Sequence, residues 1–327
     1  MSRSTPDWES RIGRRLRLRD LHILSTVVQW GSMAKAASHL AMSQPAVSEA
    51  IASLEAALGV RLLDRTPRGV EPTLYASALL RRGLVVFDEL RQGIKEIEFL
   101  ADPTAGEVQI GCPESLAAGF VPEVIDQFSR KYPRVLVHVD VAPLATQEFR
   151  ELRERTVDLS LGRMFKPVAD DEIDAEVLFQ DDHFVVAGAR SPWARRRKVA
   201  LADLLDEPWI LFPPNTVIAS LIAQAFGARG LELPRACVTS FSGAIRMRLV
   251  ATGRFLTIMP GSMLRPNAGR WDLKALPIAL DALSHPIAVL KLKHRTASPV
   301  VQKFIEHLRA AAKSMAAPAS RIPSPLR

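Results

Sequence analysis

The sequence predicts an α/β protein with a helix-turn-helix near its N-terminus. Three observations support this fold class. Residues 32–54 carry two short runs of apolar residues at helical spacing, separated by a tight turn. Residues 73–100 contain one long amphipathic helical pattern. From residue 107 onward, short apolar segments alternate with helical ones, which is typical of βα units. The 327 residues are enough for two or more domains.

Composition excludes several classes of protein. Apolar residues make up 48% and charged residues 24% of the chain, as in ordinary globular proteins. No run of 18 apolar residues and no apolar stretch after the Arg-rich N-terminus is found, so we expect neither a transmembrane helix nor a signal peptide. Two distant cysteines fit a reduced, cytoplasmic chain. The net charge of +8 suits a polyanionic partner, although a charge run is often only a solvated face.

The chain begins with a polar segment that contains four arginines. We interpret residues 1–15 as a flexible basic arm, which either contacts phosphates or is a solvated tail. Apolar residues from Leu18 to Val28 then recur at helical spacing and predict a first helix. Gly31 is placed to end that helix in a left-handed conformation.

Residues 32–54 predict the helix-turn-helix itself. Ser32 and Ser43 can cap the two helices, and Pro45 fits the first turn of the second one. Gln44, Ser48 and Glu49 are then exposed at the start of a recognition helix, where an amide side chain can pair with adenine. The alternative is a helical hairpin inside a larger α domain; we favour DNA binding.

Residues 60–73 predict a short β-ribbon with a basic tip. Directly after a helix-turn-helix, such a ribbon is expected to be a wing, with Arg65 and Arg68 on phosphates or in the minor groove. A soluble turn is the alternative. Together, the predicted DNA-binding residues of the domain at 16–73 are Ser32, Lys35, Ser43, Gln44, Pro45, Ser48, Glu49, Arg65 and Arg68.

The segment LRLRDLHILSTVVQWGSMAKAASHLAMSQPAVSEAIASLEAALGVRLLDRTPRGVEPT resembles the N-terminal domain of the LysR-type transcriptional regulators. The family pattern G-S-x-x-x-A-A-x-x-L, S-Q-P-A-x-S and L-E-x-x-L-G-x-x-L-x-x-R is present almost unbroken. Two positions depart from it. Glu49 stands where many members carry a basic residue; it would repel phosphate but could accept a hydrogen bond from cytosine. Ala76 stands where members often have glycine, which should only stiffen the next helix.

Residues 74–105 predict a linker helix followed by a hinge. Apolar residues recur three or four apart through Leu100, so this stripe must be buried against something. Packing against its own domain is one possibility. The resemblance implies the other, an antiparallel dimerisation helix.

Strands are expected at 107–112, 135–141, 157–163, 182–189, 208–212, 236–241, 255–260 and 285–292, in parallel sheets with helices on both faces. A closing helix is expected at 299–315 and a disordered tail at 316–327. The looser resemblance of residues 106–315 implies a two-lobed, periplasmic-binding-protein-like α/β effector domain, with one lobe at 106–177 and 279–315 and the other at 178–278. Arg155 and Phe255 replace glycines of the family pattern.

Ligands bind outside the carboxyl ends of strands in such sheets. The loops there supply the candidate effector-binding residues Cys112, Glu114, Ser115, Thr146, Arg163, Asn215 and Thr216. Most have a second interpretation. Ser115 could be only a helix cap, and Arg163 a surface ion pair with Asp170 or Asp171. Glu114 would disfavour a carboxylate ligand and favour a cationic or hydroxyl-bearing one, or complement a helix N-terminus. Cys112 fits an inert buried thiol better than a redox sensor.

Enzyme chemistry finds no support, because nucleophile-elbow, phosphate-loop and metal motifs are absent from the sequence. Asp181, Asp182 and His183 are consecutive and would alternate faces of a strand, so we predict neither a metal nor a cofactor. The resemblance implies a cytoplasmic regulator whose partners are promoter DNA, a small-molecule effector of unknown class, further copies of the chain and RNA polymerase. A solute-binding protein on the same scaffold is the alternative.

Overall fold

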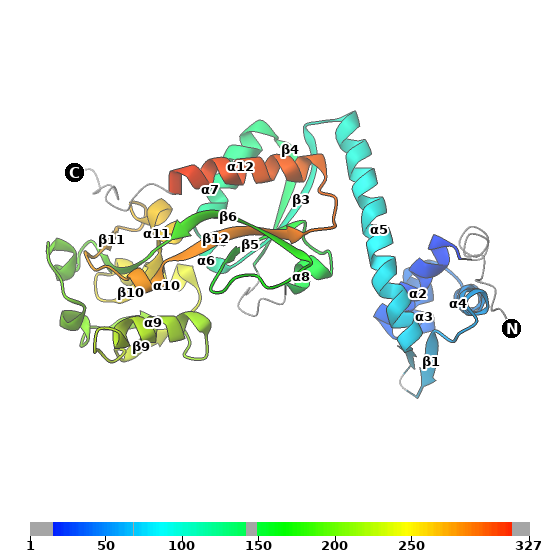
Figure 1. The fold of residues 1–327 in the computed structure, drawn as a ribbon, viewed down its shortest axis with the longest axis horizontal. Helices are drawn as coiled ribbons and strands as arrows, with labels where there is room; N and C mark the ends of the chain where they lie inside the picture. The colour runs from blue at the N-terminus through cyan, green and yellow to red at the C-terminus, as the bar shows by residue number, and fades with distance from the viewer. Residues whose placement is uncertain (1–15, 68, 142–148, 316–327) are drawn as a thin grey trace. The chain divides into compact units, whose positions relative to one another are not determined.

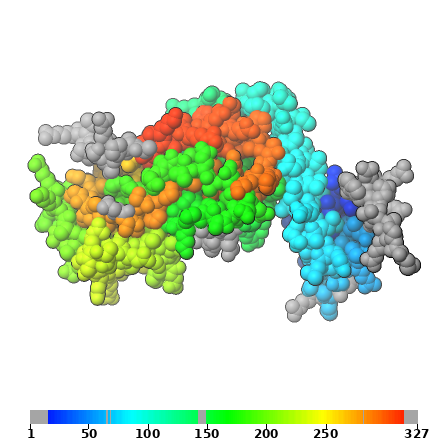
Figure 2. All heavy atoms as spheres, viewed as in Figure 1, coloured from blue at the N-terminus to red at the C-terminus, as the bar shows by residue number. Residues whose placement is uncertain are grey.

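The computed structural model describes residues 16–315 except Arg68 and residues 142–148, and it describes Arg65 and Asp281 by their backbone alone. The predicted arm and tail lie outside the described residues. The chain forms two compact units, Met1–Arg91 and Gln92–Arg327 (Figures 1 and 2). Among the helices of the described residues, none combines the length and hydropathy that a bilayer crossing requires.

The described residues that precede Leu74 form three helices and a two-stranded ribbon. The helices are α2 (Leu18–Trp30), α3 (Met33–His39) and α4 (Gln44–Leu58). Their apolar faces share one core, which also takes in Leu62 of the following segment. Strands β1 (Leu63–Thr66) and β2 (Gly69–Pro72) pair antiparallel. The predicted winged helix-turn-helix is therefore confirmed.

The helix α5 (Leu74–Ala101) runs through 28 residues without a break. Its first turns join the core of the first unit, where Ala76 is fully buried. Six apolar side chains farther along remain exposed: Leu84, Val86, Leu90, Ile94, Ile97 and Leu100. Packing against its own chain therefore does not bury the apolar stripe.

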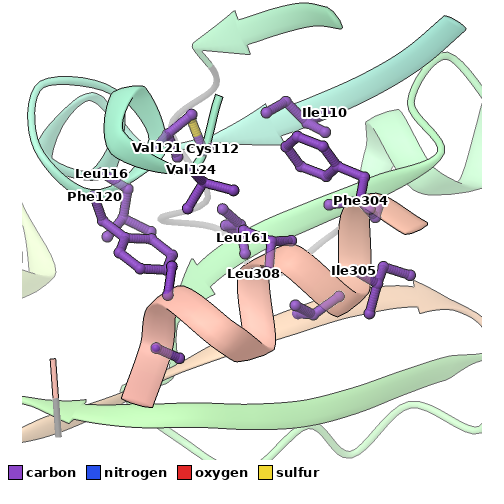
Figure 3. Packing of buried hydrophobic residues seen from close by; sticks show 14 of the residues in the cluster. Ile110, Cys112, Leu116, Phe120, Val121, Val124, Leu161, Phe304, Ile305 and Leu308 are labelled. Carbon is purple, nitrogen blue, oxygen red and sulfur yellow. The ribbon is translucent and has the colours of Figure 1, made fainter. Parts of the chain in front are cut away.

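The second unit begins with a five-stranded sheet in the order β4-β3-β5-β12-β6. Its strands are β3 (Ala105–Cys112), β4 (Arg134–Val141), β5 (Leu159–Arg163), β6 (Ile173–Asp181) and β12 (His285–Leu292). Helices α7 (Phe120–Lys131) and α12 (Pro299–Met315) pack their apolar faces on this sheet. Figure 3 shows Phe304 and Leu308 of α12 beside Ile110 and Leu161 of the sheet. A second apolar cluster includes Leu152 of the short α8 (Arg150–Arg153).

The other sheet has the order β11-β7-β10-β8-β9. Its strands are β7 (His183–Gly188), β8 (Trp209–Leu211), β9 (Ala236–Thr239), β10 (Leu256–Pro260) and β11 (Leu273–Ala275). The helices of this lobe are α9 (Val217–Gly227), α10 (Gly243–Ala251) and α11 (Gly261–Asn267), with short 3₁₀ turns at Pro192–Arg195, Leu201–Leu204 and Asp281–Leu283. Separate apolar clusters lie in this lobe. The predicted two-lobed α/β architecture is confirmed.

The prediction of parallel sheets holds for only part of each sheet. β12 pairs antiparallel with β5 and β6, and β7 pairs antiparallel with β10 and β11. The remaining pairs are parallel. The reason is connectivity. The chain leaves the first lobe after β6 and returns to it through β12, and β7 is the first strand that it forms in the second lobe. The antiparallel pairs therefore involve strands next to the two crossovers.

The lobe boundaries also differ from those expected. β6 stays in the first sheet through Asp181, so the first crossover falls at Asp182, not after residue 177. Leu280 and Leu283 pack in the core of the second lobe, so the return falls at Ser284, not after residue 278. Arg155, which replaces a glycine of the family pattern, has a φ of 56° and thus keeps the left-handed conformation that glycine favours.

Candidate DNA-binding surface and ligand pocket

The recognition helix α4 begins with a capped and exposed first turn. The Ser43 hydroxyl accepts a hydrogen bond from the Ala46 N–H at 3.3 Å, and Pro45 lies in the first turn. Val47 is fully buried, whereas Gln44, Pro45 and Glu49 are exposed and Ser48 is half-buried. The helix therefore presents a polar face that starts at Gln44.

The preceding helix α3 is capped in the same way. The Ser32 hydroxyl accepts from the Lys35 N–H at 3.4 Å, and the Lys35 side chain is exposed. Ala36 and Ala37 are buried against the other helices. The two serines thus act as helix caps, and any contact with DNA would be additional to that role.

Two contacts fix the wing relative to the helices. Glu55 of α4 accepts hydrogen bonds from the Leu62 and Leu63 N–H groups at 2.7 and 3.3 Å. The Val70 N–H donates to the Gly31 carbonyl at 3.0 Å. Arg65 lies in β1, and Arg68 lies outside the described residues. The ribbon is therefore held beside α4 and the end of α2.

A pocket of about 340 Å³ lies between the two lobes of the second unit. Most of its wall is apolar, and both lobes contribute. From the first lobe come Pro113, Glu114, Ser115, Val141, Arg163 and Phe165, and from the second His183, Phe212, Thr216, Val217, Ile218, Phe241, Arg246 and Pro260. A mostly apolar pocket with a few polar groups is the usual form of a small-molecule site.

The structure brings four of the seven predicted effector residues together. Glu114, Ser115, Arg163 and Thr216 all line the pocket. The Thr216 hydroxyl accepts from the Ala219 N–H at 3.3 Å and donates to the Pro213 carbonyl at 2.8 Å, so it caps α9.

The remaining three predicted residues lie elsewhere. Asn215 is exposed and is not among the residues that line the pocket. Cys112 is fully buried in the core of the first lobe, and burial raises the pKa of its thiol to about 12. Thr146 lies outside the described residues.

Arg163 does not form the expected surface ion pair with Asp170 or Asp171. Its Nη2 donates to Oδ2 of Asp181 at 2.7 Å, and both side chains are buried. Asp170 pairs with Arg153 instead. The difference follows from the sheet order, because β12 pairs with both β5 and β6 and thereby brings the ends of those strands together.

Glu114 complements a helix N-terminus, as one of its interpretations predicted, but the helix belongs to the opposite lobe. Its Oε1 accepts from the Gly243 N–H at 2.7 Å, at the first residue of α10. A Cβ at Gly243 would lie 2.9 Å from this oxygen and 2.3 Å from Cε of Met263. The two lobes are thus joined by a hydrogen bond at the edge of the pocket.

Sequence reasoning missed two buried polar residues of the pocket, His183 and Arg246. The Nδ1 of His183 hydrogen-bonds the Leu283 carbonyl at 2.7 Å, and burial lowers the pKa of the ring well below its usual value. Arg246 lies on the buried face of α10, four residues before the buried Val250. That spacing was the available signal: it places Arg246 on an inward face of an expected helix.

Family models match both units. The model described as "Bacterial regulatory helix-turn-helix protein, lysR family" matches residues 18–77, and the model described as "LysR substrate binding domain" matches residues 101–313. The chain belongs to the LysR family. It is a DNA-binding transcriptional regulator with an effector-binding domain.

Curated relatives match the chain over most of its length. It is 28% identical to the HTH-type transcriptional regulator GbpR of Azospirillum brasilense, over 95% of this chain and 91% of that protein. It is also 28% identical to the transcriptional dual regulator GltC of Bacillus subtilis, over 80% of this chain and 86% of that protein.

Solved structures share the fold. CbnR, a LysR family transcriptional regulator, aligns with a TM-score of 0.59 at 23% identity, covering 90% of this chain and 99% of that one. A full-length OxyR variant from Pseudomonas aeruginosa aligns with a TM-score of 0.62 at 20% identity, covering 94% of this chain and 99% of that one.

Proposed function

We propose that the first turns of α4 read base edges in the major groove and that the wing contacts the DNA backbone. The observation that supports this is the exposed, capped start of α4, with the apolar residues Val47 and Ile51 turned into the core. Gln44 offers an amide that matches adenine, and Glu49 an acceptor that matches cytosine. Ser32, Lys35 and Ser43 lie on the same helix-turn-helix and would position it on phosphates.

Selection of binding sites from a random DNA library tests this assignment. Gln44→Ala is expected to lose about 1–3 kcal/mol of discrimination at one base position. The matched control is Gln29→Ala, which removes an exposed amide from α2. If Gln44→Ala selects the same sites as the unchanged chain, Gln44 does not read bases. Binding is also expected to weaken steeply with salt, because basic side chains release counterions from DNA.

We further propose that the pocket between the lobes holds the effector, with Ser115 and Thr216 at its polar positions. An effector that favours one arrangement of the lobes would change the geometry of the DNA-binding units. We infer a regulatory role without catalysis, in the cytoplasm where promoter DNA is reached. Thermal unfolding of the full chain against small metabolites tests the pocket, since a ligand of the native state raises its stability.

The exposed stripe of α5 supports dimerisation of the chain through this helix. Ile94, Ile97 and Leu100 are each more than half exposed, an arrangement that a second copy of the helix would bury. Sedimentation of the full chain tests it. Ile97→Lys is expected to shift the chain toward monomer, and the neighbouring exposed Glu98→Lys is the control. Unchanged association of Ile97→Lys would place the interface elsewhere.

A further inference from the structure

Arg246 is a buried cation that has no carboxylate at ion-pair distance among the described residues, although the charge of Glu114 acts on it. Its side chain belongs to a residue that is 2% exposed, and no ion pair joins it to a carboxylate within the described residues. Three other cations of this unit whose side chains are largely buried differ: Arg163 pairs with Asp181, and both Lys95 and Arg295 pair with Asp158. Burying an unpaired charge is costly, so such a residue calls for an explanation.

The protein satisfies one side of the Arg246 guanidinium. Nε and Nη2 donate to the Thr257 hydroxyl at 3.2 and 3.0 Å, and Nη2 also donates to the Ile258 carbonyl. The Thr257 hydroxyl donates in turn to the Ile210 carbonyl at 2.7 Å, so its oxygen is free to accept. The guanidinium carbon lies 4.1 Å from the centre of the Phe212 ring. The group is therefore held in one orientation.

The other side of the guanidinium is left for the pocket. Nη1 has no hydrogen-bond partner among the described residues and is accessible to solvent. Arg246 itself lines the cavity. Two N–H donors of a fixed, planar cation are thus available there. A carboxylate oxygen can accept a charge-assisted hydrogen bond from Nη1, and its negative charge offsets that of the guanidinium.

The rest of the pocket limits the ligand to a single negative charge. Glu114 lines the same cavity; its charge is partly offset by the Gly243 N–H at the start of α10 and also acts on Arg246. Arg163 is neutralised by Asp181. A second anionic group on the ligand would therefore meet the Glu114 carboxylate without a free cation to balance it.

The body of the ligand faces apolar walls. Phe165, Phe212 and Phe241 come from three different segments, and Val141, Val217 and Ile218 complete the surface. Such walls gain free energy from burying aromatic or branched alkyl groups. A sugar or a phosphorylated metabolite would leave its polar groups unpaired against them.

We propose that the effector is an apolar monocarboxylate, an aryl or branched-alkyl acid whose carboxylate binds Nη1 of Arg246. This inference rests on the proposed effector role of the pocket and names its ligand class. The carboxylate completes the hydrogen bonding of the guanidinium, and the apolar body lies against Phe212 and its neighbours.

Calorimetric titration of the full chain with a matched set of probes tests the ligand class. The monocarboxylates are phenylacetate, 3-phenylpropionate and 4-methylpentanoate. Phenylacetamide keeps the shape and removes the charge, phenylsuccinate adds a second carboxylate, and phenethylamine reverses the charge. At least one monocarboxylate is expected to bind, and the other three probes at least tenfold more weakly. Equal binding of phenylacetate and phenylacetamide, or no binding of any monocarboxylate, would overturn the proposal.

Two variants on α10 then test the residue. Arg246→Met keeps the length of the side chain without its charge and is expected to weaken monocarboxylate binding at least tenfold. Arg248→Met removes an exposed arginine from the same helix and is expected to change nothing. Full binding by a folded Arg246→Met would contradict the assignment, while the probe comparison on the unchanged chain does not depend on this variant folding.

Failure of this inference can be told apart from failure of the proposed function. If phenylacetamide or phenethylamine binds in the pocket and alters DNA binding, the pocket is an effector site for another ligand class. If Gln44→Ala changes the selected DNA sites while no probe binds, the assignment of base reading to α4 is supported and the monocarboxylate proposal is overturned.

Discussion

The Asp181 carboxylate joins the two lobes of the effector-binding domain. Its Oδ2 accepts from Nη2 of Arg163 at 2.7 Å and from the Ser262 hydroxyl at 2.5 Å, and its Oδ1 accepts from the Ser262 N–H at 2.8 Å. Asp181 ends β6, and Ser262 lies in the first turn of α11. One buried carboxylate therefore holds the first crossover against both sheets.

Asp181→Asn is expected to be strongly destabilising. It leaves the buried Arg163 without its counter-charge, and removing one partner of a buried ion pair costs about 3–5 kcal/mol. Denaturant unfolding of the full chain measures the change. Asp126→Asn is the control, because the Asp126–Arg130 pair is mostly exposed and such pairs contribute about 0–1 kcal/mol. Similar losses in the two variants would mean that the Asp181 pair has no special role.

Gly69→Ala should disturb the wing. Gly69 has a φ of 136°, and a Cβ there would lie 2.2 Å from the Gly31 carbonyl oxygen. The ribbon would have to move away from α2, with a loss of more than about 1 kcal/mol in the unfolding free energy of the first unit. Calorimetry and DNA affinity measure the effect. Gly93→Ala provides a control of opposite sign: its Cβ would meet nothing within 4 Å, and the change should stabilise α5 by about 0.5–1 kcal/mol.

The sequence was informative where a signal is local. Gly31 ends α2 in the left-handed conformation that its position predicts, and the predicted bounds of β12 and α12 agree with the structure. β6 was missed because charged residues interrupt its apolar ones, as in a loop, and β11 is only three residues long. The direction of pairing was missed because it depends on the crossovers, which no local pattern records.

The residues of the pocket were likewise predictable only where a local pattern in the sequence marks them. Loops at strand ends located Glu114, Ser115, Arg163 and Thr216, because a sheet brings such ends together. The Arg163–Asp181 pair and the buried Arg246 could not be found in this way. Each depends on which residues from distant segments meet in the folded lobes, and that is decided by packing.

His183 predicts a loss of stability in mild acid. Burial is the main cause that lowers its pKa. In mild acid the unfolded state therefore binds a proton at this ring, whereas the folded state leaves the ring neutral. The unfolding free energy should be constant well above the unfolded pKa of about 6.5 and fall as the pH drops through it. The pKa of His285 is lowered in the same direction, also chiefly by burial. Denaturant unfolding between pH 8 and 5 measures the slope.

His183→Gln should reduce this acid sensitivity, because glutamine does not titrate. His294→Gln changes an exposed histidine of the same unit and should leave the slope as it is. A slope that is equal in the two variants would assign the acid sensitivity to other groups.

The two cysteines are expected to differ sharply in reactivity. Burial raises the pKa of Cys112 to about 12, so at pH 8 roughly one thiol in ten thousand is the reactive thiolate. Cys237 is exposed on β9. Iodoacetamide at pH 8, followed by mass spectrometry of the native chain, should modify Cys237 and leave Cys112 unmodified until denaturant is added. Rapid modification of Cys112 in the native chain would reopen a redox role for this thiol, since it would show that the core of the first lobe opens to reagents.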